Sequence, residues 1–190
     1  MTNNRSAPAR FTVVSRLLHW SMVVMVVTQL LIGVTMVASL SYYPLLLAIH
    51  RPLGVAILVL ALIRLANRLT HRPPPFLATM SRTERRIATW SEYLLYALLL
   101  AQPLVGWAML SAARFPIVLY GPVHLPGIAA HNITLYAALR LSHSILALLL
   151  FVTFTAHMCA VLFHTFVLRD RILDRMALWP TRHPRAQRHP

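Results

Sequence analysis

Long apolar runs without any charged side chain dominate the pattern of this chain. Residues 17–50, 93–113 and 141–168 contain no Asp, Glu, Lys or Arg. A helix needs about 20 apolar residues to cross the hydrocarbon core of a bilayer, because each residue adds only about 1.5 Å along the helix axis. Each run is therefore long enough for at least one crossing, and the mean hydropathy of +0.64 is typical of a chain embedded in lipid.

A fourth apolar stretch, residues 45–66, is interrupted only by His50, Arg51 and Arg64. Both arginines lie near its ends, where a long side chain can reach the lipid headgroups. We therefore predict an all-α fold, a single membrane domain built as a bundle of four transmembrane helices. The predicted spans are about residues 17–39, 45–66, 91–112 and 141–166, with a cytoplasmic arm at 1–16 and a cytoplasmic tail at 167–190.

The positive charges are distributed unevenly between the two predicted sides of the membrane. The net charge is +14, and all 18 basic residues are arginines. Arg51, Arg114 and Arg140 fall on one side, and all the others flank spans on the opposite side. Cytoplasmic segments beside spans are enriched in basic residues, so this asymmetry places both termini in the cytoplasm. Clustering beside spans also argues against a nucleic-acid partner, and the single Cys159 excludes an internal disulfide.

The connections between the spans carry signals of their own. In the cytoplasmic connection, Pro73, Pro74 and Pro75 predict an extended segment, because proline cannot continue a helix. Ser81 and Glu84 have the spacing of a capping box, which predicts a helix start that runs on into the third span. The outer connection at about 113–140 is rich in Pro and Gly, so we expect turns there and room for a short helix.

Four of the ten histidines lie inside predicted spans: His19, His50, His143 and His157. An ionisable side chain within a span is costly and usually has a partner or a function. Topology places His19 near the inner face and His50 near the outer face. His143 and His157 are 14 residues apart, about 21 Å along one helix and on nearly one face of it. The fourth span thus offers one imidazole at each depth, and the first and second spans offer a partner for each.

Two imidazole pairs at two depths fit two bis-histidine haems. Haem iron takes one ligand on each face of a flat apolar ring, and bundle interiors commonly hold such cofactors. Zinc would need more ligands at one point, usually with carboxylate or thiolate help, and the uncharged runs contain no carboxylate. We predict His19 and His157 as ligands of the inner iron, and His50 and His143 as ligands of the outer iron. His164, one heptad beyond His157, is the alternative inner ligand, although its distance of about 31 Å from His143 favours His157.

At these histidines the chain resembles the prokaryotic cytochrome b561 family. The resemblance covers about residues 11–180. The matching segments are Leu18-His19-Trp20, His50-Arg51-Pro52-Leu53-Gly54, Leu95-Tyr96, Pro103-Leu104-Val105-Gly106-Trp107, His143, His157, His164 and Trp179-Pro180. The resemblance implies a cytochrome of the bacterial inner membrane with two haems b, which moves electrons between the periplasmic face and quinone. The member type it resembles most oxidises superoxide to dioxygen and reduces ubiquinone, an enzyme activity. The alternative is an electron-carrier subunit that serves a partner dehydrogenase or another redox protein.

The arginines divide into two candidate sets. Arg51, Arg114 and Arg140 lie on an outer face without carboxylates, where they would attract a small anion or simply anchor helix ends. Arg16 and Arg64 lie at the inner side, where they would pair with haem propionates or simply add to the excess of positive charge on the cytoplasmic side. The expected partners are therefore membrane lipid, quinone, and superoxide or a redox protein. The alternative from a different class of function is a helix bundle without haem that has a transport or structural role.

Overall fold

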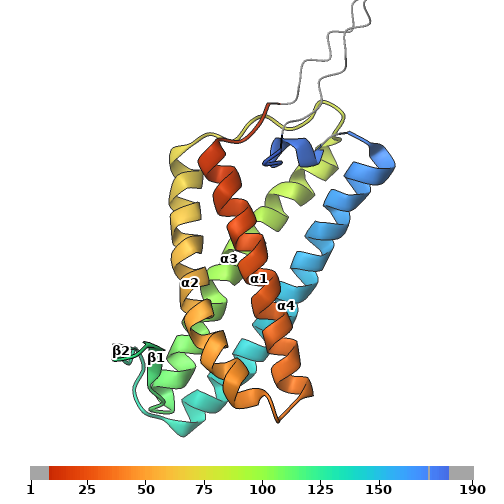
Figure 1. The fold of residues 1–190 in the computed structure, drawn as a ribbon. Helices are drawn as coiled ribbons and strands as arrows, with labels where there is room; N and C mark the ends of the chain where they lie inside the picture. Colours follow the sequence, from red (N-terminus) through yellow and green to blue (C-terminus); the bar gives the residue numbers. More distant parts are fainter. Residues whose placement is uncertain (1–8, 171, 180–190) are drawn as a thin grey trace, which may run out of the picture.

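Four long helices form a bundle in the computed structural model, which describes residues 9–170 and 172–179 (Figure 1). The helices are α1 (Val13–Ala38), α2 (Tyr43–Thr70), α3 (Arg82–Ala112) and α4 (Ile133–Phe163). Each is long and apolar enough to cross a membrane, so the predicted four-helix membrane fold is confirmed. Each helix also begins before its predicted span, because the hydropathy pattern marks the lipid-embedded part, and residues at the membrane surface already belong to the helix.

Local sequence sets the helix starts. Thr12 caps α1 by accepting a hydrogen bond from the Ser15 backbone N–H at 3.2 Å. Ser81 and Glu84 form the predicted capping box at the start of α3, where each side chain bonds the other residue's backbone N–H. Asn132 caps α4 through its side-chain oxygen. Such caps satisfy backbone N–H groups that have no partner within the helix.

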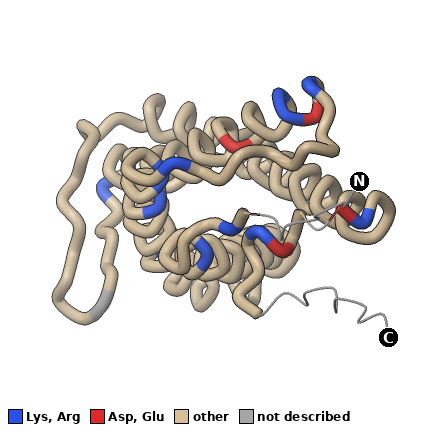
Figure 2. Tube along the Cα trace, turned by 90° about the horizontal axis from the view of Figure 1, so that it is seen from above, with Lys and Arg blue, Asp and Glu red and all other residues tan. Residues whose placement is uncertain are grey.

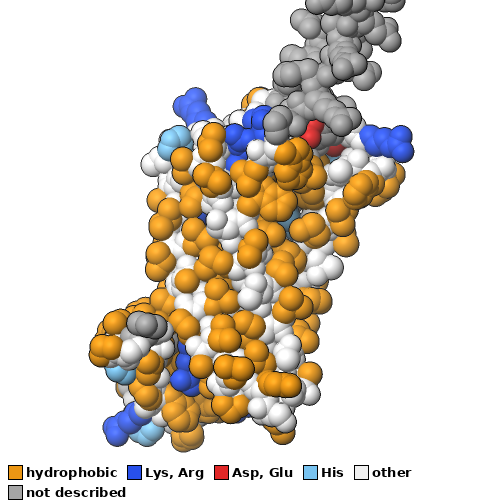
Figure 3. Space-filling view, viewed as in Figure 1, with side chains coloured by type: hydrophobic (Ala, Val, Ile, Leu, Met, Phe, Trp, Pro, Cys, Tyr) orange, Lys and Arg blue, Asp and Glu red, His pale blue; other side chains and the backbone are white. Residues whose placement is uncertain are grey.

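The bundle is built from two helix pairs, α1 with α2 and α3 with α4, which join mainly through α2 and α3. Seen along the bundle, the four helices surround a central axis (Figure 2). One apolar layer fills the middle. Its buried residues are Met22, Val26, Ile57, Ala61, Leu98, Leu99 and Leu150. Most other large apolar side chains point outward, and they cover the visible face between two ends that carry the arginines (Figure 3). That distribution suits a surface in contact with hydrocarbon.

The outer connection is a β-hairpin and not the short helix for which the sequence left room. Strands β1 (Ile117–Tyr120) and β2 (Val123–Leu125) pair antiparallel across a turn at Gly121, whose φ is +52°. Glycine adopts that backbone conformation without strain, which favours a tight turn over a helix. The Trp107 indole donates a hydrogen bond to the Pro126 carbonyl at 2.8 Å and thereby fastens the connection to α3.

The segment after α4 folds back over the inner end of the bundle. The last turn of α4 widens into a π-helix, η1 (His164–Leu168), and a 3-10 turn follows, η2 (Ile172–Arg175). The Arg175 guanidinium donates to the carbonyls of Pro74 and Pro75 at 2.8 and 2.7 Å. Burial lowers the pKa of Arg175 from its ordinary value. The predicted tail thus begins with an ordered segment, at 172–179, that packs on the bundle. The predicted tail residues 180–190 and most of the arm, 1–8, lie outside the described residues.

Candidate functional site

The imidazoles of His50 on α2 and His143 on α4 face each other in the outer half of the bundle. Their ring centres are 6.3 Å apart, and their planes are inclined at 74°. An imidazole nitrogen binds a transition metal at about 2.0–2.1 Å, so two imidazoles that share one metal have ring centres a little over about 6 Å apart. The centre distance of this pair is compatible with one iron held between the two rings.

The surroundings of these rings also bear on a metal site. The Nδ1 atoms of His19 and His50 are buried and have no hydrogen-bond partner among the described residues, and the His143 imidazole lies at the Gln102 backbone. A metal bound at Nε2 would fix the ring proton on Nδ1. Imidazoles set in an apolar bundle have the chemistry of haem ligands, so these residues fit the two haems that the sequence predicts.

The inner pair, His19 on α1 and His157 on α4, lies near the opposite end of the bundle. The two imidazoles lie within electrostatic range of each other, and the Arg64 guanidinium lies within electrostatic range of both. His19 also contacts the neighbouring Trp20 edge to face, with ring centres 5.9 Å apart. The structure therefore places the two predicted inner ligands in one region of the bundle, on the helices that the topology argument named.

The central apolar layer separates the two histidine levels. Leu150 in this layer is seven residues from both His143 and His157, about 10 Å along α4 in each direction. The four predicted ligands therefore lie at two depths, with a packed apolar layer between them.

His164, the alternative inner ligand, already has a different partner. Its Nδ1 lies 2.5 Å from a carboxylate oxygen of Asp170, and both side chains are largely buried. It also sits in the π-helical turn, where helix geometry departs from that of the rest of α4. This pairing supports His157 as the inner ligand and leaves His164 as a hydrogen-bonded group at the inner end.

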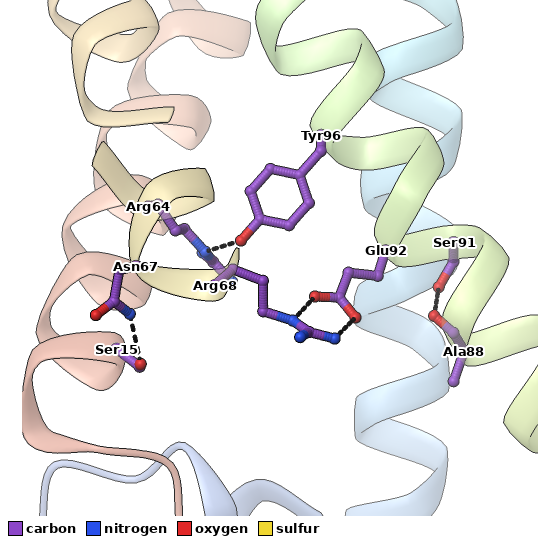
Figure 4. A network of polar contacts seen from close by, with 8 residues as sticks. All are labelled: Ser15, Arg64, Asn67, Arg68, Ala88, Ser91, Glu92 and Tyr96. Carbon is purple, nitrogen blue, oxygen red and sulfur yellow. Dashed lines mark hydrogen bonds and ion pairs between the residues drawn. The ribbon is translucent and has the colours of Figure 1, made fainter. Parts of the chain in front are cut away.

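The two inner arginines have protein partners in this structure. Arg16 donates to the Ala177 carbonyl at 2.8 Å, so it helps to hold the folded-back segment. Arg64 donates to the Tyr96 hydroxyl at 3.2 Å, and its guanidinium lies 5.7 Å from the centre of the Tyr96 ring (Figure 4). Arg10 also bonds the Ala177 carbonyl, and the Trp20 indole bonds the Met176 carbonyl at 2.9 Å. The propionate role of Arg16 and Arg64 stays a prediction.

An ion pair between α2 and α3 was missed by the sequence reasoning. Arg68 donates to both carboxylate oxygens of Glu92, at 2.7 and 3.3 Å (Figure 4). One signal was present in the sequence, because Glu92 is the acidic residue inside a predicted span and a buried charge needs a partner. Nearby, the Asn67 amide donates to the Ser15 hydroxyl at 2.7 Å and links α2 to α1.

The three outer arginines take different positions. Arg51 follows the ligand His50, and its Nε is buried without a partner among the described residues. Arg140 reaches the Tyr136 hydroxyl at 3.5 Å within α4. Arg114 is exposed and lines a cavity of about 370 Å³ between the end of α3 and the hairpin, together with His131. The structure therefore leaves all three cationic groups on the outer half of the molecule.

No group of three or more His, Cys, Asp or Glu side chains comes together in the described part of the chain. Paired imidazoles are thus the metal-binding arrangement that the described residues offer. Cys159 is exposed on α4 and is not part of such a cluster. Two ligands from two helices suit a metal that is already held in a macrocycle, which supplies the remaining bonds.

Comparisons with known proteins find a matching family model and related proteins. The model of the family described as prokaryotic cytochrome b561 matches residues 10–178. A Yersinia pestis protein named "Probable superoxide oxidase CybB" is 29% identical over 160 residues, which cover 84% of this chain and 90% of that protein. "Cytochrome b561 homolog 2" of Escherichia coli K12 is 28% identical over 178 residues, which cover 90% of this chain and 93% of that protein.

The family match extends over nearly all of the four-helix bundle, including every predicted ligand. It implies b-type haem, electron transfer and a multi-pass location in a bacterial membrane. Together with four helices of membrane-spanning length, it establishes what kind of protein this is. The chain belongs to the prokaryotic cytochrome b561 family and is a membrane electron carrier.

Proposed function

We propose that this protein is a superoxide:quinone oxidoreductase of the bacterial inner membrane that holds two haems b. His50 and His143 hold the outer haem, and His19 and His157 hold the inner one. The observation that carries the proposal is the facing imidazole pair, with ring centres 6.3 Å apart, beneath an outer face whose charged residues are all arginines. A relative named as a probable superoxide oxidase supports the same reading at 29% identity.

The reaction balances as a two-electron reduction of one quinone by two superoxide anions. Each superoxide loses one electron at the periplasmic face and leaves as dioxygen. Ubiquinone receives the two electrons and two protons and becomes the quinol. The haems, when bound, supply one-electron transfer through the apolar layer, which no side chain of the chain itself provides.

The charges of the chain favour an anionic reductant at the outer face. All four acidic residues, Glu84, Glu92, Asp170 and Asp174, belong to the half where α3 begins and α4 ends. The opposite half carries Arg51, Arg114 and Arg140. A surface with charges of one sign attracts small ions of the other sign and raises their rate of encounter. The field therefore concentrates superoxide beside the His50–His143 pair.

The inner end has the groups that quinone reduction needs. Reduction consumes two protons, and His164 with Asp170 forms a hydrogen-bonded pair there. The ordered segment 172–179 covers the same end and is held by the side chains of Arg16 and Trp20. In this proposal, protons reach the quinone from the cytoplasmic side through polar groups of this end.

A stopped-flow experiment tests the proposal. Purified, haem-loaded protein is mixed under anaerobic conditions with potassium superoxide, and the haem absorbance is followed with and without a soluble ubiquinone. We expect fast haem reduction that slows as salt is added, and steady quinol formation when quinone is present. A protein that holds two haems but is not reduced by superoxide would contradict the proposal and favour the carrier role for a partner dehydrogenase. A protein without a Soret band would favour a haem-free bundle.

A further inference from the structure

The backbone carbonyls of the two proposed outer ligands each accept a hydrogen bond from a glutamine on the neighbouring helix. Gln29 on α1 donates through Nε2 to the His50 carbonyl on α2 at 3.0 Å. Gln102 on α3 donates through Nε2 to the His143 carbonyl on α4, also at 3.0 Å. The same arrangement thus occurs in both helix pairs of the bundle, at the level of the outer site.

Small residues make both carbonyls accessible. In a helix, the side chain four positions later lies over the carbonyl of the earlier residue, because side chains point towards the N-terminus. Four residues after His50 is Gly54, and four after His143 is Ala147. A Cβ at position 54 would lie only 3.3 Å from the Gln29 amide nitrogen, so a larger residue there would crowd the glutamine. A carbonyl oxygen has two lone pairs, and the helix uses only one of them.

The other end of each glutamine has no partner among the described residues. The Oε1 atoms of Gln29 and Gln102 are buried and accept no hydrogen bond from them. A buried acceptor without a donor is destabilising. Both helix pairs therefore keep a destabilising polar group at the level of the outer site.

A purely structural role does not explain these glutamines. The helix already satisfies the ligand carbonyls, and an apolar side chain would fill the same space in the bundle without leaving a buried oxygen unpaired. The inner pair has no such support, because no described side chain donates to the carbonyl of His19 or of His157. The arrangement is specific to the outer level.

We propose that Gln29 and Gln102 are positioning residues for the outer haem. Their amide N–H groups fix the helical turns that carry His50 and His143. This inference rests on the proposed two-haem function. Without its glutamine, a turn can shift and move its imidazole, so the properties of the outer haem change and those of the inner haem do not.

The test is a spectroelectrochemical titration of the full-length, haem-loaded protein and of the variants Gln29→Met and Gln102→Met. Methionine keeps the length of the side chain and removes both polar groups. We expect the midpoint potential and the low-spin EPR signal of the outer haem to shift, while the inner haem keeps both values as an internal reference. Thr35→Val and Ser142→Ala are matched controls on α1 and α4, because each removes only a hydroxyl bond to its own helix.

The haem content keeps the test decisive if the methionine variants lose haem. Loss of the outer haem alone, or changes confined to the outer haem, support the proposal. An unchanged outer haem, or equal changes of both haems, would overturn it. No substrate is present in the titration, so its result is independent of whether superoxide is the reductant.

Discussion

Single imidazoles define the two proposed haem sites, and each can be removed separately. We expect His50→Ala and His143→Ala to lose the same haem, and His19→Ala and His157→Ala to lose the other, because each iron needs two axial ligands. The haem-to-protein ratio should fall from two to about one in each variant, and a redox titration should show one remaining b-type centre. His164→Ala should keep both haems. Loss of the inner haem in that variant alone would move the ligand assignment from His157 to His164.

A glycine beside the outer ligand gives a second prediction at the residue scale. A Cβ at Gly106 would lie 3.0 Å from Cε1 and 3.3 Å from Nδ1 of His143, whereas a Cβ at Gly33 would meet no atom within 4 Å. Gly106→Ala should therefore displace the imidazole and change the EPR signal or the occupancy of the outer haem. Gly33→Ala, the matched control, should leave both haems unchanged and stabilise α1 by about 0.4–1 kcal/mol. Identical haem spectra for the two variants would contradict the expected contact.

At the scale of helices, a polar contact joins the two helix pairs. Arg68 on α2 and Glu92 on α3 are paired at 2.7 Å, with side chains 31% and 36% exposed, so solvent weakens their attraction only in part. Breaking the pair should cost about 0.5–1 kcal/mol. A double-mutant cycle of Arg68→Gln and Glu92→Gln, read from the thermal loss of haem, measures this coupling. Additive single effects would mean that the pair contributes nothing to helix docking.

At the scale of the whole molecule, the separation of charge predicts how an anion approaches. Arg114→Glu should slow the reaction with superoxide by several-fold at low salt, because it reverses one of the outer charges. The effect should shrink as salt screens it, and the haem content should not change. Arg82→Glu makes the same change at the exposed inner end and serves as the control. Equal slowing by both variants would show that net charge, and not the outer field, controls the rate.

The fold follows from local quantities that the sequence carries. The thickness of the hydrocarbon layer and the rise of a helix show that each apolar run is long enough to be a span. The positions of the arginines give the orientation of the spans. The depths of His19, His50, His143 and His157 follow in the same way, because depth depends only on position along a helix. Ser81 also predicts its helix start, because a cap depends on neighbours in sequence.

The contacts between helices could not be predicted from the hydropathy pattern, because in a membrane both the lipid-facing and the core-facing positions are apolar. The pattern therefore does not reveal how each helix is rotated about its axis. Only the tertiary structure brings the rings of His50 and His143 within 6.3 Å of each other and brings Gln29 and Gln102 to their carbonyls.

The sequence by itself determined that the chain crosses the membrane four times with histidines at two depths, since charge, hydropathy and helix rise act along the chain. The tertiary structure decided which side chains meet. It bonds Arg16 to the Ala177 carbonyl, pairs Arg68 with Glu92 and folds the outer connection into a hairpin. These outcomes depend on packing between segments far apart in sequence, and packing is settled only when the whole bundle assembles.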